Sequence, residues 1–122
     1  MARILIVDDD MDIVEAGKVM LEMAGHEVLA AYNAKDGLTA ALEQKPDLLV
    51  LDVMMDEPDD GFALAQTLRG RGIKTPILML TSVSRVSGLT FGADQDLLPV
   101  DDFVQKPVDP VVLQEKVRKL LG

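Results

Sequence analysis

Two short apolar runs in this sequence each end on carboxylates. Ile4–Val7 is followed by Asp8–Asp10, and Leu48–Leu51 is followed by Asp52. Continuous apolar runs of this length are typical of parallel strands that helices cover on both faces. The carboxyl ends of such strands form the ligand-binding edge of an open α/β sheet. If the two strands are neighbours, several like charges meet at that edge, and a cation is needed to neutralise them.

Hydroxyl and ammonium groups follow two later apolar runs. Ile77–Leu80 is followed by Thr81 and Ser82, and Phe103–Val104 comes shortly before Lys106. A carboxylate nucleophile, a divalent cation, a hydroxyl and an ammonium are the groups needed to accept a phosphoryl group as an aspartyl phosphate. Mg²⁺ suits this set, because it prefers oxygen ligands and usually takes one or two protein carboxylates.

Each of these residues also has a structural interpretation. Asp8–Asp10 could be favourable charges at a helix N-terminus, and for Asp10 alone a helix cap is the preferred interpretation. Thr81 alone could be a turn hydroxyl, and Lys106 alone a surface lysine. Asp52 is harder to explain in this way, because an unpaired carboxylate at the end of an apolar strand is costly. The functional hypothesis therefore rests on the joint pattern.

The elements that must position these residues alternate between strands and helices, as in repeated βα units. The expected strands are Arg3–Val7, Glu27–Ala31, Leu48–Leu51, Ile77–Leu80 and Phe103–Val104. The expected helices are 10–24 with Asp10 as its cap, Ala34–Gln44, Gly61–Arg69, and a last helix that Asp109 caps and Pro110 begins. With right-handed crossovers, this predicts an α/β fold: a flavodoxin-like, doubly wound, five-stranded parallel sheet of order 2-1-3-4-5 with helices on both faces.

Helical spacing also predicts which helix faces are buried. The expected stripe of the first helix is Ile13, Ala16, Met20 and Met23 or Ala24, and that of the last helix is Val112, Val117, Leu120 and Leu121. The segment Ser82–Gly92 is rich in Ser, Gly and β-branched residues, which are poor helix formers. The fourth helix is therefore expected to be short or irregular.

Size and charge bound the function. The chain has 122 residues, which predicts one domain over 1–122, and it has no cysteine. Its 12 Lys and Arg against 21 Asp and Glu give a formal charge of −9, so its field repels nucleic acid and anionic membranes. We expect no signal peptide, because the start of the sequence leads straight into an expected strand, and the sequence contains no apolar run of about 20 residues. We expect a cytoplasmic protein that binds neither DNA nor membrane directly.

Four segments together resemble the motifs of the response-regulator receiver domain of bacterial two-component signalling, in particular its single-domain chemotaxis regulators. They are Ile4–Asp9, Leu51–Met55, Ile77–Ser82 and Asp102–Pro107. They follow the order and spacing of that family over nearly the whole chain. The resemblance implies that a sensor histidine kinase, a phosphotransfer protein or another phosphodonor phosphorylates Asp52 in a Mg²⁺-dependent reaction. Phosphorylation would then switch the surface that binds an unknown downstream protein.

The resemblance also implies a role for each site residue. The implied metal ligands are Asp9 directly, Asp8 through water, Asp52, and the backbone carbonyl of Met54. Thr81 would bond the phosphoryl group, Lys106 would pair with it, and Phe103 would be an aromatic switch whose rotamer follows Thr81. The bond between Lys106 and Pro107 would be cis.

The sequence departs from the usual family pattern in two places. Asp56 stands where receivers usually carry a proline, in a loop, Asp56–Asp60, that is acidic and looks one residue longer than usual. The stretch from Thr81 to Lys106 looks about three residues longer than is typical, which predicts an unusual partner or a regulated order-to-disorder segment.

Three functions can be weighed on these residues. The first is a stand-alone receiver, expected because the chain ends at Gly122 just after the last helix; it would be no enzyme beyond self-catalysed phosphoryl transfer and slow autodephosphorylation. The alternative is a pseudo-receiver that is not phosphorylated and acts as a protein-interaction scaffold. A Mg²⁺ phosphohydrolase is disfavoured, because Met54 and Val83 offer no polar group to position water.

Overall fold

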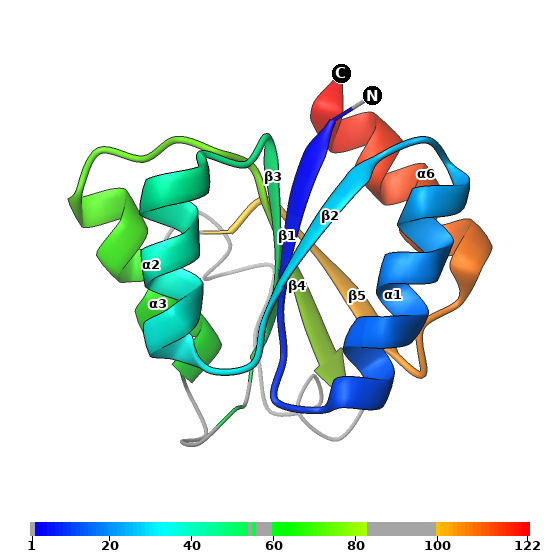
Figure 1. Cartoon of the computed structure of the whole chain (residues 1–122), viewed down its shortest axis with the longest axis horizontal. Coiled ribbons are helices and arrows are strands. Elements are labelled where there is room, and N and C mark those ends of the chain that lie inside the picture. The colour runs from blue at the N-terminus through cyan, green and yellow to red at the C-terminus, as the bar shows by residue number, and fades with distance from the viewer. Residues whose placement is uncertain (1, 54, 56–59, 83–99) are drawn as a thin grey trace, which may run out of the picture.

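The computed structural model describes residues 2–53, 55, 60–82 and 100–122, which form five strands and four helices. The strands are β1 (Arg3–Val7), β2 (Glu27–Ala31), β3 (Leu48–Asp52), β4 (Ile77–Ser82) and β5 (Asp102–Lys106). The helices are α1 (Met11–Met23), α2 (Ala34–Gln44), α3 (Asp60–Gly70) and α6 (Pro110–Leu121). Helices α1 and α6 cover one face of the sheet, and α2 and α3 cover the other (Figure 1).

The sheet is parallel, and its order is β2-β1-β3-β4-β5, which confirms the predicted fold class. In the register, Val7 of β1 lies beside Leu51 of β3, and Ser82 of β4 lies beside Lys106 of β5. The chain leaves β1 toward one face, through α1, and leaves β3 toward the other, through α3 (Figure 1). The carboxyl ends of β1 and β3 therefore form a topological switch point, the crevice at which ligands bind in such sheets.

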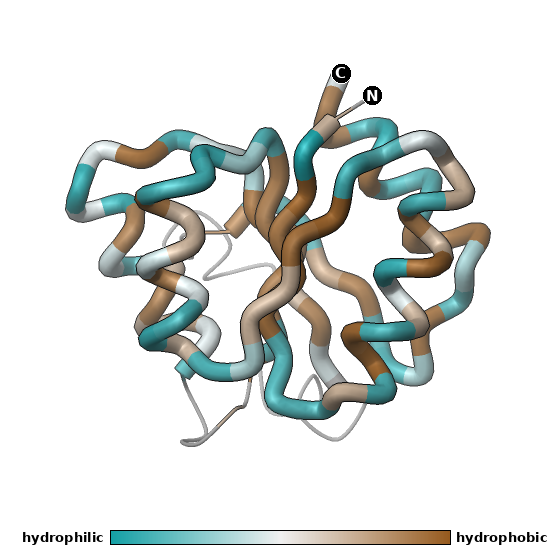
Figure 2. The backbone as a smooth tube through the Cα atoms, in the orientation of Figure 1, coloured by the Kyte–Doolittle hydropathy of each residue, from teal (hydrophilic) through white to brown (hydrophobic). Residues whose placement is uncertain are grey.

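The apolar residues form one core on each face of the sheet. The core under α2 and α3 includes Leu5, Leu49 and Met79, and the core under α1 and α6 includes Ile6, Val50 and Leu80. Figure 2 shows the strands as mostly hydrophobic and the helices on either side as alternating between hydrophobic and hydrophilic residues. Because side chains alternate along a strand, the β3 run Leu48–Asp52 is buried on both faces, as its unbroken apolar composition predicted.

The buried stripe of α1 differs from the predicted one by a rotation of the helix. Val14 and Leu21 are fully buried, whereas Ala16 is exposed and Met23 is 81% exposed. Of the predicted residues, only Ile13 and Met20 pack against the core. Adjacent stripes have the same spacing on a helix, so periodicity alone did not determine which one faces the sheet.

Helix α6 shows a smaller error of the same kind. Val117 is buried as predicted and Leu120 and Leu121 are partly buried, but Leu113 takes the place predicted for Val112. Val112 is 38% exposed. Both residues lie in the first turn after the cap, Asp109. The orientation of that turn relative to the sheet determines that Leu113, and not Val112, is buried.

The caps and turns follow the sequence signals. The side chain of Asp10 caps α1, and Asp109 caps α6 with Pro110 in its first turn. Gly25, after the end of α1, has a φ of 93°, which glycine adopts without strain. The peptide bond between Lys106 and Pro107 is cis, as the resemblance implied.

Three strands run further than predicted, and the additional residues belong to the site. β3 ends at Asp52 instead of Leu51, β4 ends at Ser82 instead of Leu80, and β5 ends at Lys106. Parallel neighbours supply hydrogen bonds to these polar end residues, which overcomes their weak strand propensity. The expected irregular fourth helix lies outside the described residues. Among the residues that are described, no helix is both long and apolar enough to cross a membrane.

Candidate functional site

Alternation along the strands brings three charged side chains to the same face of the sheet. Asp8 follows Ile4 and Ile6, and Asp52 follows Leu48 and Val50, all in the core under α1 and α6. The backbone N–H of Asp8 still donates to Ala31 of β2 at 3.1 Å, so the strand pattern continues through Asp8. Lys106 has the same relation to Val104 of β5. The strand ends therefore direct two carboxylates and one ammonium into the crevice between β1 and β3.

The ammonium of Lys106 bridges the two carboxylates. Its Nζ donates to Asp52 Oδ1 at 2.9 Å and to Asp8 Oδ2 at 3.1 Å. The side chains of Asp8 and Asp52 are 0% and 8% exposed, and that of Lys106 is 20% exposed. Charge-assisted hydrogen bonds of this kind are about twice as strong as neutral ones, so they hold the three groups in one arrangement.

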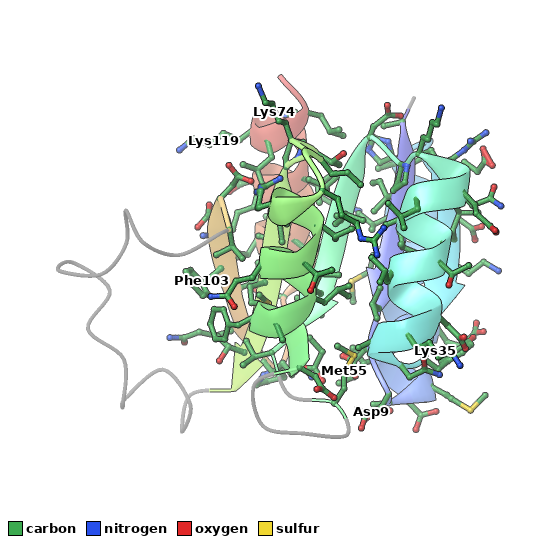
Figure 3. All side chains as sticks on the ribbon, turned by 90° about the vertical axis from the view of Figure 1, so that its left-hand side faces the viewer. Asp9, Lys35, Met55, Lys74, Phe103 and Lys119 are labelled. Atoms are coloured by element: carbon green, nitrogen blue, oxygen red, sulfur yellow. The ribbon has the colours of Figure 1, made fainter. Side chains whose placement is uncertain are left out.

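Asp9 completes a group of three carboxylates that could hold a metal ion. One oxygen each from Asp8, Asp9 and Asp52 lies within 4.8 Å of the others. Opposite ligands of Mg²⁺ are about 4.2 Å apart at its usual bond lengths of about 2.1 Å, so these oxygens need only small movements to bind one ion. Asp9 is exposed and lies at the lower edge of the sheet in Figure 3, which leaves room for water ligands. The donor set therefore fits a hard divalent cation.

The electrostatics of the metal-free site favour such a cation. Burial raises the pKa of Asp8, and the charge of Asp52 raises it further, against a lowering by the N–H of Asp10 and by Lys106. Partial desolvation at the crevice and the charge of Asp8 raise the pKa of Asp9. Ionisation of either carboxylate therefore costs additional free energy, and a bound cation offsets that cost.

Lys106 stays charged in this environment. Burial taken alone would lower the pKa of its ammonium, but the hydrogen bond that it donates to Asp52 and the charges of both carboxylates outweigh burial and raise the pKa above 10.5. The ammonium is therefore a permanent positive charge next to Asp52 at physiological pH.

Asp10 has the structural role that was preferred for it. Its Oδ1 accepts from the N–H groups of Asp12 and Ile13 at 2.9 and 3.4 Å. The N–H of Asp10 donates to Asp8 Oδ1 at 2.9 Å. The cap of α1 therefore also fixes the orientation of the Asp8 carboxylate, which the sequence pattern did not reveal.

Thr81 and Phe103 lie toward the opposite face of the sheet. Thr81 is two residues after Met79 on β4 and is 1% exposed, and Phe103 is the register partner of Met79 on β5. Phe103 packs against Phe62 of α3 with 6.5 Å between ring centroids, and Figure 3 shows it beside α3. The predicted switch pair thus shares one face, next to the crevice but on the side away from Lys106.

Two sequence features fall outside the described residues: the Met54 carbonyl, expected as a metal ligand, and the acidic loop that contains Asp56. One residue was missed by sequence reasoning. Gly61, in the first turn of α3, lies directly against the main chain of Asp52 and Val53. Only its position at the start of a helix was visible in the sequence.

Comparisons with known proteins agree with this geometry. Residues 4–118 match the family described as the response regulator receiver domain. The chain is 38% identical over 123 residues to the DNA-binding dual master transcriptional regulator RpaA of Synechocystis, covering 99% of this chain and 49% of that protein. It is 37% identical to the alkaline phosphatase synthesis transcriptional regulatory protein PhoP of Bacillus subtilis, covering 98% of this chain and 48% of that protein.

Solved structures show the same likeness at the level of the fold. The receiver domain of the Francisella response regulator 1452 has a TM-score of 0.85 at 27% identity, covering 99% of this chain and 97% of that one. The chemotaxis protein CheY4 of Vibrio cholerae also has a TM-score of 0.85 at 27% identity, with 98% of both chains covered. The chain belongs to the response-regulator receiver-domain family of two-component systems.

The expectation about partners is wrong as drawn from the sequence. It excluded DNA, but the curated relatives are named as transcriptional regulators and RpaA as DNA-binding. The chain spans about half the length of these relatives, with 49% and 48% covered. The net charge of −9 describes only this chain. It was therefore a poor guide to DNA binding by relatives that are about twice as long. The comparisons identify no partner of this chain.

Proposed function

We propose that the domain accepts a phosphoryl group on Asp52 in a Mg²⁺-dependent reaction and thereby switches its surface. The observation that carries the proposal is the Lys106 ammonium, 2.9 Å from Asp52 Oδ1 and within the same crevice as the carboxylates of Asp8 and Asp9. A purely structural ion pair does not need a group of three carboxylates beside one ammonium. A site that binds both a metal ion and a phosphoryl group does need such a group.

The reaction needs little from the protein beyond position and charge. A carboxylate oxygen of Asp52 forms a bond to the phosphorus of the donor. The bond between phosphorus and the leaving oxygen breaks, and the leaving group departs with that electron pair; with acetyl phosphate it is acetate. Lys106 neutralises charge that grows on the phosphoryl oxygens, and it transfers no proton because its pKa lies above 10.5.

Asp8, Asp9 and Asp52 would hold the cation. When bound, Mg²⁺ neutralises the negative charge shared by the carboxylates and the incoming phosphoryl oxygens. Asp8 is held for this task by the N–H of Asp10 and by Lys106. The Met54 carbonyl is proposed as a further ligand on the strength of the family resemblance.

Thr81 and Phe103 would transmit the change. Thr81 is the penultimate residue of β4, the strand next to β3, and Phe103 lies on the same face of the sheet. A hydroxyl that moves toward the phosphoryl group leaves space on the face that Phe103 shares, so the aromatic ring can change its rotamer. Its packing against Phe62 would then change, which carries the signal toward α3 and β5.

The acyl phosphate should persist for minutes or longer. The side chains two residues after Asp52 and two residues after Thr81 are Met54 and Val83. Neither can hydrogen-bond a water molecule for attack on phosphorus. A half-life of seconds, measured with Mg²⁺ present, would contradict this part of the proposal.

Intact mass spectrometry tests the proposal. The protein is incubated with Mg²⁺ and acetyl phosphate, and wild type is compared with Asp52→Asn. Asp47→Asn is a matched control, since Asp47 accepts from the Arg3 N–H at 2.8 Å near the opposite end of β1 and an amide can replace it there. We expect one phosphoryl group on wild type and on the control and none on Asp52→Asn.

Other outcomes distinguish the remaining functions. The absence of any adduct on wild type would favour the scaffold that is never phosphorylated. Continuous release of phosphate without an accumulated adduct would favour the phosphohydrolase.

We propose further that the domain serves transcriptional control in the cytoplasm. The support is the likeness to the transcriptional regulators RpaA and PhoP, at 38% and 37% identity. The transcripts of cells that carry Asp52→Asn in the natural gene should differ from those of wild-type cells under the stimulus. Identical transcripts under all conditions that phosphorylate wild type would contradict it.

A further inference from the structure

The first turn of α3 rests directly on the backbone of the residue at the centre of the site. We infer that Gly61 is a positioning residue for Asp52: the absence of a side chain at position 61 places the Asp52 carboxylate within reach of Lys106 and the metal ligands. The inference rests on the proposed function, because it concerns how that reaction is aligned.

The space at Gly61 excludes any side chain. A Cβ atom at this position would overlap the carbonyl oxygen of Asp52 and would meet its carbonyl carbon and the Cα of Val53 at 2.8 Å each. All three atoms belong to the backbone, so no rotamer change can relieve the contact. A carbon and a carbonyl oxygen rarely approach closer than about 3.3 Å, so α3 and the end of β3 would have to separate by about 1 Å.

Hydrogen bonds clamp the same short piece of backbone from two sides. The N–H of Val53 donates to Leu80 of β4 at 3.0 Å, and the N–H of Gly61 donates to the carbonyl of Val53 at 2.8 Å. These two hydrogen bonds hold the end of β3 between β4 and the first turn of α3. A separation at Gly61 would break or lengthen the second bond and would free Asp52 from one side.

The Asp52 carboxylate has little tolerance for such a movement. Its Oδ1 is 2.9 Å from Lys106 Nζ, and one of its oxygens lies within 4.8 Å of one oxygen each of Asp8 and Asp9. Displacements of about 1 Å in a reacting group cost about 100-fold in rate. Gly61→Ala should accordingly slow phosphorylation at saturating Mg²⁺ by about 10- to 100-fold and weaken Mg²⁺ binding by about tenfold or more.

The same helix provides matched controls. Gly70, at the other end of α3, has nothing within 4 Å of its Cβ position, so Gly70→Ala changes the residue type without the contact. Leu68 is a fully buried residue of α3 in the core between this helix and the sheet, so Leu68→Val lowers stability without touching the site. Together they separate positioning from helix propensity and from general destabilisation.

The experiment measures two quantities for each variant. Initial rates of adduct formation with acetyl phosphate are taken by intact mass at saturating Mg²⁺ and corrected for the folded fraction from circular dichroism. Mg²⁺ affinity is taken by isothermal titration calorimetry. We expect losses in both quantities for Gly61→Ala and values within about twofold of wild type for Gly70→Ala and Leu68→Val.

Several results would overturn the inference. A Gly61→Ala rate within about twofold of wild type would do so, and so would an equal loss in Leu68→Val. If wild type forms no adduct, the proposed function fails, yet the Mg²⁺ affinities still decide: weakened binding in Gly61→Ala alone supports the positioning role, and unchanged binding overturns it.

A measurement on wild type covers the case in which Gly61→Ala does not fold. Hydrogen exchange of the Gly61 amide is followed with and without Mg²⁺ and beryllofluoride. Slower exchange with these ligands supports the coupling between α3 and Asp52. Unchanged exchange shows that the contact does not respond to the site and overturns the inference.

Discussion

Replacing Lys106 by methionine tests the electrostatic description of the site. Methionine keeps an unbranched side chain of similar length but removes the ammonium that donates to Asp52 and Asp8 at 2.9 and 3.1 Å. Two carboxylates, one of them fully buried, then face each other without a counter-charge. In the absence of Mg²⁺, we expect a large loss of stability at neutral pH.

The structure bounds the size of this loss. Removing one partner of a buried ion pair costs about 3–5 kcal/mol. Because the Lys106 side chain is 20% exposed, we expect about 2–3 kcal/mol at pH 7. The loss cannot exceed the cost of protonating one of the two carboxylates at pH 7. With an ordinary pKa of 3.8, pH 7 lies 3.2 units higher, and at about 1.36 kcal/mol per unit this cost is about 4 kcal/mol.

The pH dependence follows from the sign of each shift. The pKa of Asp8 is raised in the folded protein, so its contribution to stability is present below 3.8 and is lost as pH rises through the folded value. Without Lys106 the pKa of Asp8 rises further, so the pH range over which its contribution to stability is lost extends to higher pH. The pKa of Lys106 is raised as well, so in wild type its contribution is full below 10.5 and is lost as pH rises through the folded value.

Urea unfolding of wild type and Lys106→Met, with EDTA and with saturating Mg²⁺, measures these effects between pH 4 and pH 8. The difference in unfolding free energy should grow with pH by at most about 1.4 kcal/mol per unit and nearly vanish at pH 4. Mg²⁺ should remove much of it, since the cation neutralises the same carboxylates. A difference that is independent of pH, or one that Mg²⁺ leaves unchanged, would refute the reasoning.

Three further predictions concern single contacts. In EDTA at pH 7, Asp8→Asn should melt at a higher temperature than wild type, because ionised Asp8 has a raised pKa and costs stability; the gain should disappear below pH 3.8, and Mg²⁺ affinity should fall by about tenfold or more. Asp10→Ala should lower the unfolding free energy by about 1 kcal/mol through the lost side-chain cap of α1, yet calorimetry should give a Mg²⁺ affinity within about twofold of wild type, because alanine keeps the backbone N–H that donates to Asp8. Leu113→Ala should cost about 2–5 kcal/mol in urea unfolding and Val112→Ala less than about 0.5 kcal/mol, and equal costs would contradict the orientation of α6.

Local patterns were enough to predict the strands and most of the helix ends, and the right-handed crossover rule then gave the order of the strands. Buried parallel strands are read from runs such as Leu48–Leu51, and the cap residues Asp10 and Asp109 mark helix starts by short-range hydrogen bonds. These signals depend on neighbours in sequence, so they survive without a tertiary context. The carboxylates at the ends of β1 and β3 were found for the same reason, since strand order places those ends together.

The rotation of the helices was not predictable in this way. Ala16 and Val14 lie on adjacent stripes of α1, and both stripes have helical spacing. Packing against Ile6 and Val50 decides between them, because the surface of the sheet determines which side chains it can accept. The exchange of Val112 for Leu113 on α6 has the same origin.

The sequence by itself determined the chemistry of the site: which residue types are available, and the strand ends from which Asp8, Asp52, Thr81 and Lys106 project. Only the tertiary structure decided that Lys106 bridges Asp8 and Asp52 on one face while Thr81 lies toward the other. It alone revealed the close contact between Gly61 and the Asp52 backbone. The reason is physical: composition and periodicity carry information about each element, whereas a contact of a few ångströms depends on how separate elements pack.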